Sequence, residues 1–454
     1  MICGFDYGTS NCAIGIEQDG NVRLVPLEGT NTFLPSTLYA LDRDLISESV
    51  ARNLSSVKER ELFVEQRRLI LSRAQRVRRE EDIAADEQTL FFGRAAFAEY
   101  FQWPEDGYFV KSPKSFLGGS GLRAQHIHFF EDVVTAMMQN IKQQAEKNLG
   151  KEITHTVIGR PVNFQGIDSE ASNRQALDIL TTAGKRAGFK EIEFLYEPIA
   201  AGLDFEAKMT KNQTVLVVDI GGGTTDCAIV QMGPDFVSKE DRSADFLGHT
   251  GERIGGNDLD IRVAGKHLMP LFGMDSNLKT GLPMPTQLYW NAVTTNDVTA
   301  LATFNSLETK VQIEQLRLDA AEPKLLERFL HLREEKHNYH LVRNAEEAKI
   351  GLSDQQEHQV LLDYIEKGLN CPISREQFSQ SIQPPLEKML SLMSDAIKQA
   401  GVQPDVIYMT GGSAKSPVIR DAIQQRIGDV PVLDGDHFGS VAAGLTVWAQ
   451  RIFK

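Results

Sequence analysis

The stretch Asp219-Ile-Gly-Gly-Gly-Thr-Thr-Asp226 has a shorter counterpart near the start of the chain, Asp6-Tyr-Gly-Thr-Ser-Asn11. Both stretches continue with Cys-Ala-Ile, and they agree almost throughout once two glycines of the later copy are set aside as an insertion. This internal repeat predicts two copies of one structural unit. In each copy an apolar strand ends at an aspartate, turns through glycine and hydroxyl residues, and leads into a second strand. The sequence therefore predicts two hairpins whose tips expose backbone N–H groups.

Tips of this composition suit a polyphosphate. Glycine allows close approach of the backbone, N–H groups and hydroxyls donate to phosphate oxygens, and aspartates can hold magnesium through water. Two tips facing each other would clamp the phosphates from both sides. A P-loop differs because its glycine loop leads into a helix, and the chain has no GxxxxGK[ST] stretch. The phosphate contacts that we expect are Gly8, Thr9, Ser10, Asn11, Gly221, Gly222, Gly223, Thr224 and Thr225.

The composition of the 454-residue chain is that of a globular protein, with 41% hydrophobic and 24% charged residues. A net charge of −14 opposes non-specific binding to nucleic acid or to an anionic membrane. The chain begins without the basic and apolar regions of a secretory signal, and no apolar stretch is long enough to span a bilayer. Its four cysteines form no CxxC or zinc spacing, which suits reduced thiols. We expect a cytoplasmic protein without nucleic-acid or membrane partners.

Alternating strand and helix patterns predict α/β layers. The expected strands are 2–5, 13–16, 22–25, 156–159, 214–218 and 406–409. The expected helices are 133–149, 171–188, 320–352, 382–400 and 417–427. Residues 273–305 carry two prolines and weak periodicity, and we expect them to form loop-rich surface decoration.

Residues 47–87 are charged and helix-forming. Apolar residues are interleaved there with the arginines at positions 67, 68, 73, 76, 78 and 79. One interpretation is a basic helix that docks an acidic partner. The other is a solvated helix face balanced by neighbouring acids such as Glu80, Glu81 and Asp82, which is the more common origin of such a charge run.

Taken together, these stretches resemble the actin-like ATPase superfamily, which contains the heat-shock protein 70 chaperones, actin and its bacterial relatives, and sugar kinases. Residues 2–16 look like the first phosphate motif, 215–230 like the second, and 407–419 like the adenosine motif. The resemblance is strongest to the heat-shock protein 70 (DnaK-type) ATPase domain, and nearest to its YegD-type group of chaperone-like proteins. It implies ATP or ADP and magnesium as cofactors.

Two further motifs concern the chemistry. Lys114-Ser-Phe-Leu-Gly118 resembles the segment whose lysine orients the attacking water near the γ-phosphate. Lys111 is the alternative, and the Phe-Leu-Gly that follows favours Lys114. Glu197-Pro-Ile-Ala-Ala-Gly202 looks like the motif whose glutamate completes the magnesium and water site, and Pro161 and Arg174 match the proline switch and its arginine partner. The resemblance thus implies the catalytic residues Thr9, Lys114, Glu197, Asp219 and Thr224, and a magnesium site, mostly through water, of Asp6, Glu197, Asp219 and Asp226.

The adenosine side is implied by two more segments and the late glycine turn. Gly255-Gly256 opens a segment similar to Gly-Gly-Glu-Asp-Phe-Asp of the chaperones, and residues 345–353 resemble the helix that holds adenine and ribose. On a helix Glu346, Lys349 and Ser353 share one face. The expected contacts are Gly255, Gly256, Glu346, Lys349, Ser353, Gly411, Gly412 and Ser413.

The implied fold is the two-lobed actin-like ATPase fold, an α/β fold of duplicated ribonuclease-H-like domains with the nucleotide cleft between the lobes. Lobe I would be 1–208, with core 1–38 and 123–208 and an inserted subdomain 39–122. Lobe II would be 209–433, with core 209–254 and 375–433 and an inserted subdomain 255–374. Residues 434–454 would form a helix returning to lobe I.

The expected function is a slow magnesium-dependent ATPase whose lobe movement regulates an unidentified protein partner or client. Nothing after Lys454 resembles the interdomain linker or the β-sandwich peptide-binding domain of the chaperones, so we expect that module to be missing. Segments 47–87 and 260–346 are longer than the resemblance requires, and 434–438 departs from the Pro-Asp-Glu-Ala-Val of the family. A sugar-type small-molecule kinase and an actin-like filament former are the alternatives; the first lacks a recognisable acceptor motif, and the long insertions disfavour the second.

Overall fold

The computed structural model describes residues 1–104, 106–119, 121–164, 169–237, 239, 242–435 and 439–453. These residues form two compact units. The first comprises Met1–Arg253, Ser391–Ala414 and Ile427–Lys454, and the second comprises Ile254–Leu390 and Lys415–Arg426. Each unit is described by itself below. The division into lobes I and II stays a prediction, and three of the five residues in the divergent stretch 434–438 lie outside the described residues.

The first unit contains a sheet in the order β3-β2-β1-β8-β9, with β4 pairing β2. Strands β1, β2 and β3 form an antiparallel meander, whereas β8 and β9 run parallel to β1. The strands are β1 (Ile2–Tyr7), β2 (Asn11–Gln18), β3 (Asn21–Leu24), β4 (Leu34–Pro35), β8 (His155–Arg160) and β9 (Glu191–Tyr196).

A second sheet of the same unit has the order β12-β11-β10-β15-β16. Its first three strands are again an antiparallel meander, and β15 and β16 again run parallel to the strand that opens the meander. The strands are β10 (Gln213–Ile220), β11 (Thr225–Met232), β12 (Phe246–Glu252), β15 (Val406–Thr410) and β16 (Val432–Asp434). Two sheets with one topology confirm the duplicated α/β fold predicted from the repeat.

The alternation of side chains along β1 explains how helices cover the first sheet. Phe5 and Tyr7 point to one face, where the Phe5 ring lies 6.1 Å from that of Phe189 and the Tyr7 hydroxyl donates to Met137 Sδ at 3.4 Å. Gly4 points to the other face, where a Cβ atom would lie 2.3 Å from the backbone nitrogen of Thr446. Glycine is therefore required where helix α17 (Ser440–Ile452) passes β1.

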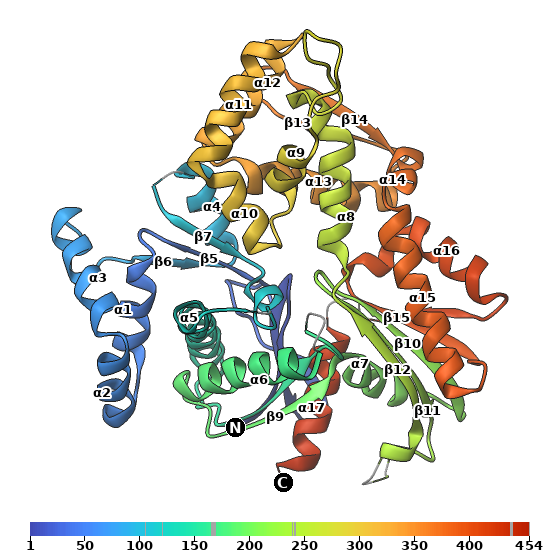
Figure 1. Cartoon of the computed structure of the whole chain (residues 1–454). Coiled ribbons are helices and arrows are strands. Elements are labelled where there is room, and N and C mark those ends of the chain that lie inside the picture. The colour runs from blue at the N-terminus through green and yellow to red at the C-terminus, as the bar shows by residue number, and fades with distance from the viewer. Residues whose placement is uncertain are drawn as a thin grey trace. The chain divides into compact units, whose positions relative to one another are not determined.

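The remaining elements of the first unit complete its layers (Figure 1). Helices α5 and α6 pack together, and the β6-β5-β7 sheet with the helices α1 to α3 follows the first meander in the chain. The helices are α1 (Asp44–Asn53), α2 (Val57–Gln66), α3 (Arg68–Glu80), α4 (Arg94–Gln102), α5 (Ala124–Leu149), α6 (Ser169–Arg186) and α7 (Glu197–Glu206). The small sheet consists of β5 (Thr37–Ala40), β6 (Leu90–Phe92) and β7 (Tyr108–Lys111), followed by the 3-10 helix η1 (Pro113–Phe116).

The second unit is mainly helical, with one hairpin, β13 paired antiparallel with β14. Its helices are α8 (Gly256–Val263), α9 (Gln287–Val293), α10 (Val298–Asn305), α11 (Leu307–Asp319), α12 (Pro323–Glu334), α13 (Asn338–Asp354) and α14 (Arg375–Ser381), and its strands are β13 (Glu357–Leu361) and β14 (Asn370–Ser374). Helices α15 (Gln383–Ala400) and α16 (Pro417–Ile427) each contain a boundary between the units. Pro417 opens α16, as predicted.

The loop expected at 273–305 is corrected, because α9 and α10 lie within it. They span only 7 and 8 residues, too few for the periodicity that identifies a helix. The start of α10 did have a signal in the sequence, because aspartate is a preferred N-cap residue. The Asp297 carboxylate accepts from the backbone N–H groups of Thr299 and Ala300 at 2.8 and 2.9 Å. Across the described ranges no helix combines the length and apolarity needed to traverse a bilayer.

Candidate functional site

The two glycine turns meet in the first unit. A Cβ atom on Gly222 would lie 1.9 Å from Ser10 Oγ, and one on Gly223 would lie 2.7 Å from Thr9 Cγ2. Side chains of the first tip thus pack directly on the glycine backbone of the second, where any larger residue would separate the two. The structure brings together the turns that the repeat marked in the sequence.

Both turns need glycine for close backbone approach. A Cβ atom on Gly8 would lie 2.2 Å from the carbonyl oxygen of Asn11, inside its own hairpin. The turn is held from outside by Ser36, whose hydroxyl donates to the Gly8 carbonyl at 2.7 Å and whose N–H donates to the Ser10 carbonyl at 2.8 Å. In the second turn the Gly221 N–H donates to the Thr224 carbonyl at 3.0 Å. These bonds fix the tips independently of any ligand.

Lys114 lies in η1 and is 4% exposed. Its ammonium group forms an ion pair with Glu197, at the start of α7, and donates to the Gly159 carbonyl at 3.2 Å. Burial lowers the pKa of Lys114, but the negative charges of Glu197 and Asp6 outweigh it, so the pKa is raised and the ammonium stays protonated. Lys111, the alternative, ends β7 with a half-buried side chain. The lysine that meets the other predicted site residues is Lys114.

Four carboxylates gather around this one lysine. Burial, followed by the charge of Glu197, raises the pKa values of Asp6 and Asp226 to about 7. Burial also raises the pKa of Asp219 well above its usual value, with further contributions from Glu197, Asp226 and Asp6. Glu197, Asp219 and Asp226 are buried and Asp6 is half-buried. One lysine cannot neutralise these four acids, so the site has a deficit of positive charge that a proton or a metal cation would fill.

Asp226 is anchored through a backbone donor. Its Oδ1 atom accepts from the Val162 N–H at 2.7 Å, and a Cβ atom on Gly251 would lie 2.3 Å from that oxygen. Its Oδ2 atom is buried and receives no hydrogen bond from the described residues. An orphaned carboxylate oxygen in an acid-rich pocket fits a hydrated magnesium ion, which prefers oxygen ligands and keeps several waters.

Within the described ranges, no group of three or more His, Cys, Asp and Glu side chains is placed to hold a metal ion directly. The four acids fit the magnesium that the fold implies as outer ligands acting through water. The role of these four acids as outer ligands of magnesium remains a prediction.

The late glycine turn lies against the second hairpin. Gly411 has a φ of +87°, and a Cβ atom there would lie 2.2 Å from the Ile220 carbonyl oxygen and 2.9 Å from Asp219 Oδ1. Both the left-handed backbone and the close approach require glycine. Gly412 is exposed and Ser413 is buried next to it. Through Gly411, the turn that resembles an adenosine motif lies against the end of β10, where the second glycine turn begins.

The other predicted adenosine residues belong to the second unit. Lys349 of α13 forms an ion pair with Asp260 of α8 at 2.7 Å and donates to the Gly256 carbonyl at 3.1 Å. Glu346 pairs with Arg343 at 3.0 Å, and the Ser353 hydroxyl donates back to the Lys349 carbonyl at 3.4 Å. Lys349 therefore connects the helix opened by Gly255-Gly256 to the helix that carries Glu346 and Ser353.

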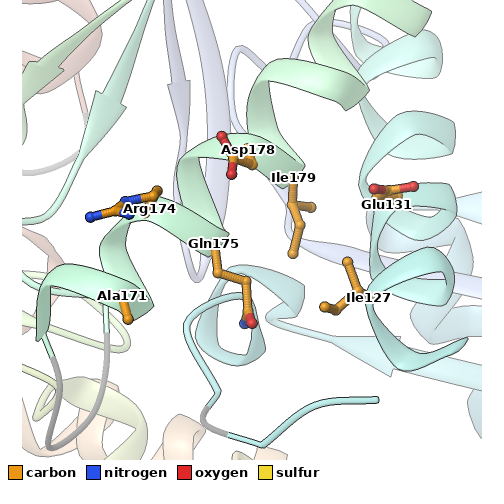
Figure 2. Close-up of a pocket in the computed structure, with 7 residues that line it drawn as sticks. All are labelled: Ile127, Glu131, Ala171, Arg174, Gln175, Asp178 and Ile179. Atoms are coloured by element: carbon orange, nitrogen blue, oxygen red, sulfur yellow. The ribbon is translucent and has the colours of Figure 1, made fainter. Parts of the chain in front are cut away.

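The predicted switch arginine lies beside a pocket of about 310 Å³ between α5 and α6 (Figure 2). Arg174 is largely exposed and pairs with Glu170 one turn earlier, at 2.8 Å. Gln175 points to the other side, where its amide donates to the carbonyls of Leu117 and Gly119 at 2.7 and 3.1 Å. Helix α6 thereby holds the segment that follows Lys114, through a residue that the sequence analysis did not select.

Ser115 is the other residue that the sequence analysis missed. It is 6% exposed, its hydroxyl has no hydrogen-bond partner within the described residues, and a Cβ atom on Gly223 would lie 3.1 Å from it. A buried hydroxyl without a partner is costly unless a ligand supplies one. The only signal in the sequence was its position next to Lys114. Polar residues are common in loops, so this position alone does not mark Ser115 as functional.

Comparison with known proteins agrees with this geometry. The family model described as Hsp70 protein matches residues 121–281 and 327–451, more than half of the chain. The chaperone protein DnaK of Thermus thermophilus is 25% identical over 330 residues, covering 70% of this chain and 43% of that protein. The chaperone protein DnaK 1 of a Synechococcus species is 24% identical over 458 residues, covering 99% of this chain and 50% of that protein.

The chain thus spans about half the length of the curated relatives that it matches. The family model covers β10 to β12 with the second glycine turn, and the longer alignments extend over the first turn as well. With its duplicated sheets, its paired tips and its matched segments, this chain belongs to the Hsp70 family.

Proposed function

We propose that this protein is a magnesium-dependent ATPase of the heat-shock protein 70 type, chaperone-like in its use of the nucleotide. The observation that carries the proposal is the meeting of the two tips, Thr9-Ser10 against Gly222-Gly223, beside a buried lysine and a cluster of four carboxylates, three of them buried. Exposed N–H groups and hydroxyls on two sides suit a chain of phosphates, whereas buried acids suit its magnesium ion.

Each residue has a role that follows from its surroundings. The hydroxyls of Thr9 and Thr224 and the glycine N–H groups donate to phosphate oxygens. Lys114, fixed by Glu197 and the Gly159 carbonyl, supplies positive charge where negative charge builds up during attack by water. Glu197 and Asp219 orient water by accepting its hydrogen bonds. Bound magnesium would neutralise phosphate charge, and Asp6, Glu197, Asp219 and Asp226 would hold its waters.

No single residue near Lys114 needs to act as a strong base. Phosphoryl transfer needs little proton abstraction in its transition state, so positioning and charge stabilisation can carry the reaction. The turnover is accordingly expected to be slow. Its output would be a movement between lobes that regulates a protein partner or client, as in the family, and the site is expected to work in the cytoplasm.

Equilibrium binding and turnover test the proposal together. Isothermal titration of the purified chain with ATP and with ADP, with and without magnesium, should give magnesium-dependent binding, and phosphate release should accompany ATP. Thr224→Ala should lower turnover because it removes a donor from the second tip. Unchanged turnover in Thr224→Ala would remove the role given to this residue. Release of ADP that depends strictly on one added polyol would instead establish a small-molecule kinase.

A further inference from the structure

A groove runs between α1 and the α2–α3 pair, away from the glycine tips. It encloses about 490 Å³, and its walls include Ala51 and Arg52 of α1 with Arg60, Val64, Arg68 and Leu71 of α2 and α3. Guanidinium groups alternate with apolar side chains along its walls. Arg60 and Val64 lie one turn apart on α2, and Arg68 and Leu71 lie one turn apart on α3, so each helix presents a pair of residues to the groove. We call this feature the α1–α3 groove; the three helices are the blue ones of Figure 1.

Most arginines of this segment are used internally. Arg67 is 1% exposed and pairs with Asp132 of α5 at 2.9 Å, and the Ser47 hydroxyl donates to the same carboxylate at 2.7 Å. Arg73 pairs with Asp44 at 2.6 Å and Arg78 with Glu48 at 2.8 Å. The interpretation of this segment as a solvated helix face is therefore wrong for Arg67. Its buried ion pair connects these helices to α5 of the same unit.

The groove itself keeps uncompensated positive charge. Its one acid, Glu48, already pairs with both Arg52, at 3.0 Å, and Arg78. Arg60 donates to the Leu54 carbonyl, which carries no charge, and Arg68 forms no ion pair with the described residues. Residues 44–80 hold nine Lys and Arg against six Asp and Glu, in a chain whose net charge is −14. Over the whole segment 47–87 the count is nine of each, so the positive excess is confined to the helices that form the groove.

Apolar side chains lie exposed in and around the groove. Val64 is 44% exposed in its wall, and Leu62 and Leu69 are 50% and 77% exposed on the same helices. Exposed apolar surface bordered by charge is a feature of interaction sites. Single exposed apolar residues need no explanation, but here they coincide with a concave wall and with unpaired guanidinium groups.

We propose that the α1–α3 groove binds an acidic amphipathic segment of a protein partner, with carboxylates on Arg60 and Arg68 and an apolar side chain against Val64 and Leu71. Guanidinium forks match carboxylates in two-point hydrogen bonds. An amphipathic helix presents both groups. The inference goes beyond the nucleotide site and does not depend on it.

Other polyanions fit less well. Nucleic acid and anionic lipid surfaces present many phosphates over a wide area, and the net charge of −14 would repel them outside the groove. Contact with a phosphate backbone would bury none of the apolar surface of the wall against another apolar group. An apolar side chain would bury that surface and contribute favourable free energy of binding.

The test uses the full chain and a fluorescent 18-residue helical peptide with glutamates and leucines on one face. Fluorescence anisotropy is measured for the wild type and for Arg60→Gln/Arg68→Gln. The matched control, Arg76→Gln/Arg79→Gln, removes the same charge from exposed positions of α3 outside the groove. Val64→Ser tests the apolar contact separately, and far-ultraviolet circular dichroism checks folding.

We expect salt-sensitive binding that weakens about tenfold or more in the groove variant, in line with losing charge-assisted hydrogen bonds, and less than about twofold in the control. Val64→Ser, and a peptide with serine in place of leucine, should also weaken binding. Equal losses in groove and control variants would reduce the effect to general charge and overturn the proposal. Absence of binding would overturn it too, as would tighter binding of a single-stranded RNA or of anionic vesicles through the same arginines.

Discussion

At the scale of single residues, the most informative side chain is Ser115. Its hydroxyl is buried without a partner in the described chain and lies near Gly223, next to Lys114. If it donates to the terminal phosphate, Ser115→Ala should weaken ATP binding about tenfold, the worth of one hydrogen bond to a charged group, and leave ADP binding nearly unchanged. Titration calorimetry with both nucleotides measures this. Equal losses for ATP and ADP would instead mark a structural role, and Ser115→Thr, which keeps the hydroxyl, should retain the preference.

A second residue makes stability depend on pH. Burial, with a contribution from His337, lowers the pKa of His340 from 6.5 to about 4, and its ring stacks on Tyr364 with centroids 3.8 Å apart. Because the unfolded chain then binds a proton that the folded chain does not, stability is lost as pH falls from about 6.5 to about 4. His340→Phe keeps the stack and should flatten this dependence in urea unfolding at pH 7.5 and 5.0. Identical dependence in both proteins would contradict the assignment.

At the scale of elements, α17 packs closely against α7. A Cβ atom on Gly444 would lie 1.7 Å from the Ala200 carbonyl oxygen. Gly444→Ala should therefore lower stability by about 1–3 kcal/mol through overpacking, despite the better helix propensity of alanine. Urea midpoints measure the loss. The control Ala443→Gly, at the preceding position of α17, measures the effect of helix propensity alone. An unchanged or raised urea midpoint in Gly444→Ala would show that α17 and α7 can move apart without loss of stability.

The elements also explain what the sequence could predict. The repeated Asp-x-Gly pattern was enough to predict both hairpins, because a turn that approaches another backbone admits only glycine, as at Gly8 and Gly222. Strand β10 was visible as a continuous apolar run because both of its faces are covered. Helices α9 and α10 were missed because each makes about two turns and leaves no periodic pattern.

Within the candidate site, a different reason limits what the sequence can predict. Lys114 could be selected through a motif, but its ion pair with Glu197 joins residues 83 positions apart, which no local pattern encodes. The Val162 N–H that anchors Asp226 has no side-chain signature at all, since any residue other than proline carries that donor. Gln175 and Ser115 are ordinary polar residues until the fold places their partners beside them.

At the scale of the whole molecule, the excess of buried acids predicts a protein stabilised by its ligand. Magnesium with ATP at about 100 times its dissociation constant should raise the free energy of unfolding by about 2.7 kcal/mol, because the ligand binds only the folded chain. Thermal unfolding should shift upward with magnesium and ATP together, and most of the shift should disappear with excess EDTA. A shift of equal size with ATP and EDTA would contradict the role of the carboxylates.

We propose that the paired tips and Lys114 form a catalytic site for ATP hydrolysis. Single-turnover hydrolysis of radiolabelled ATP, with enzyme in excess and magnesium present, tests it in the wild type, Lys114→Ala and Lys111→Ala. We predict measurable hydrolysis in the wild type and in Lys111→Ala, and a rate about 100-fold lower or more in Lys114→Ala, the usual cost of removing a preorganised charge from a transition state. Equal rates in the three proteins, or bound ATP that none of them hydrolyses, would contradict the claim.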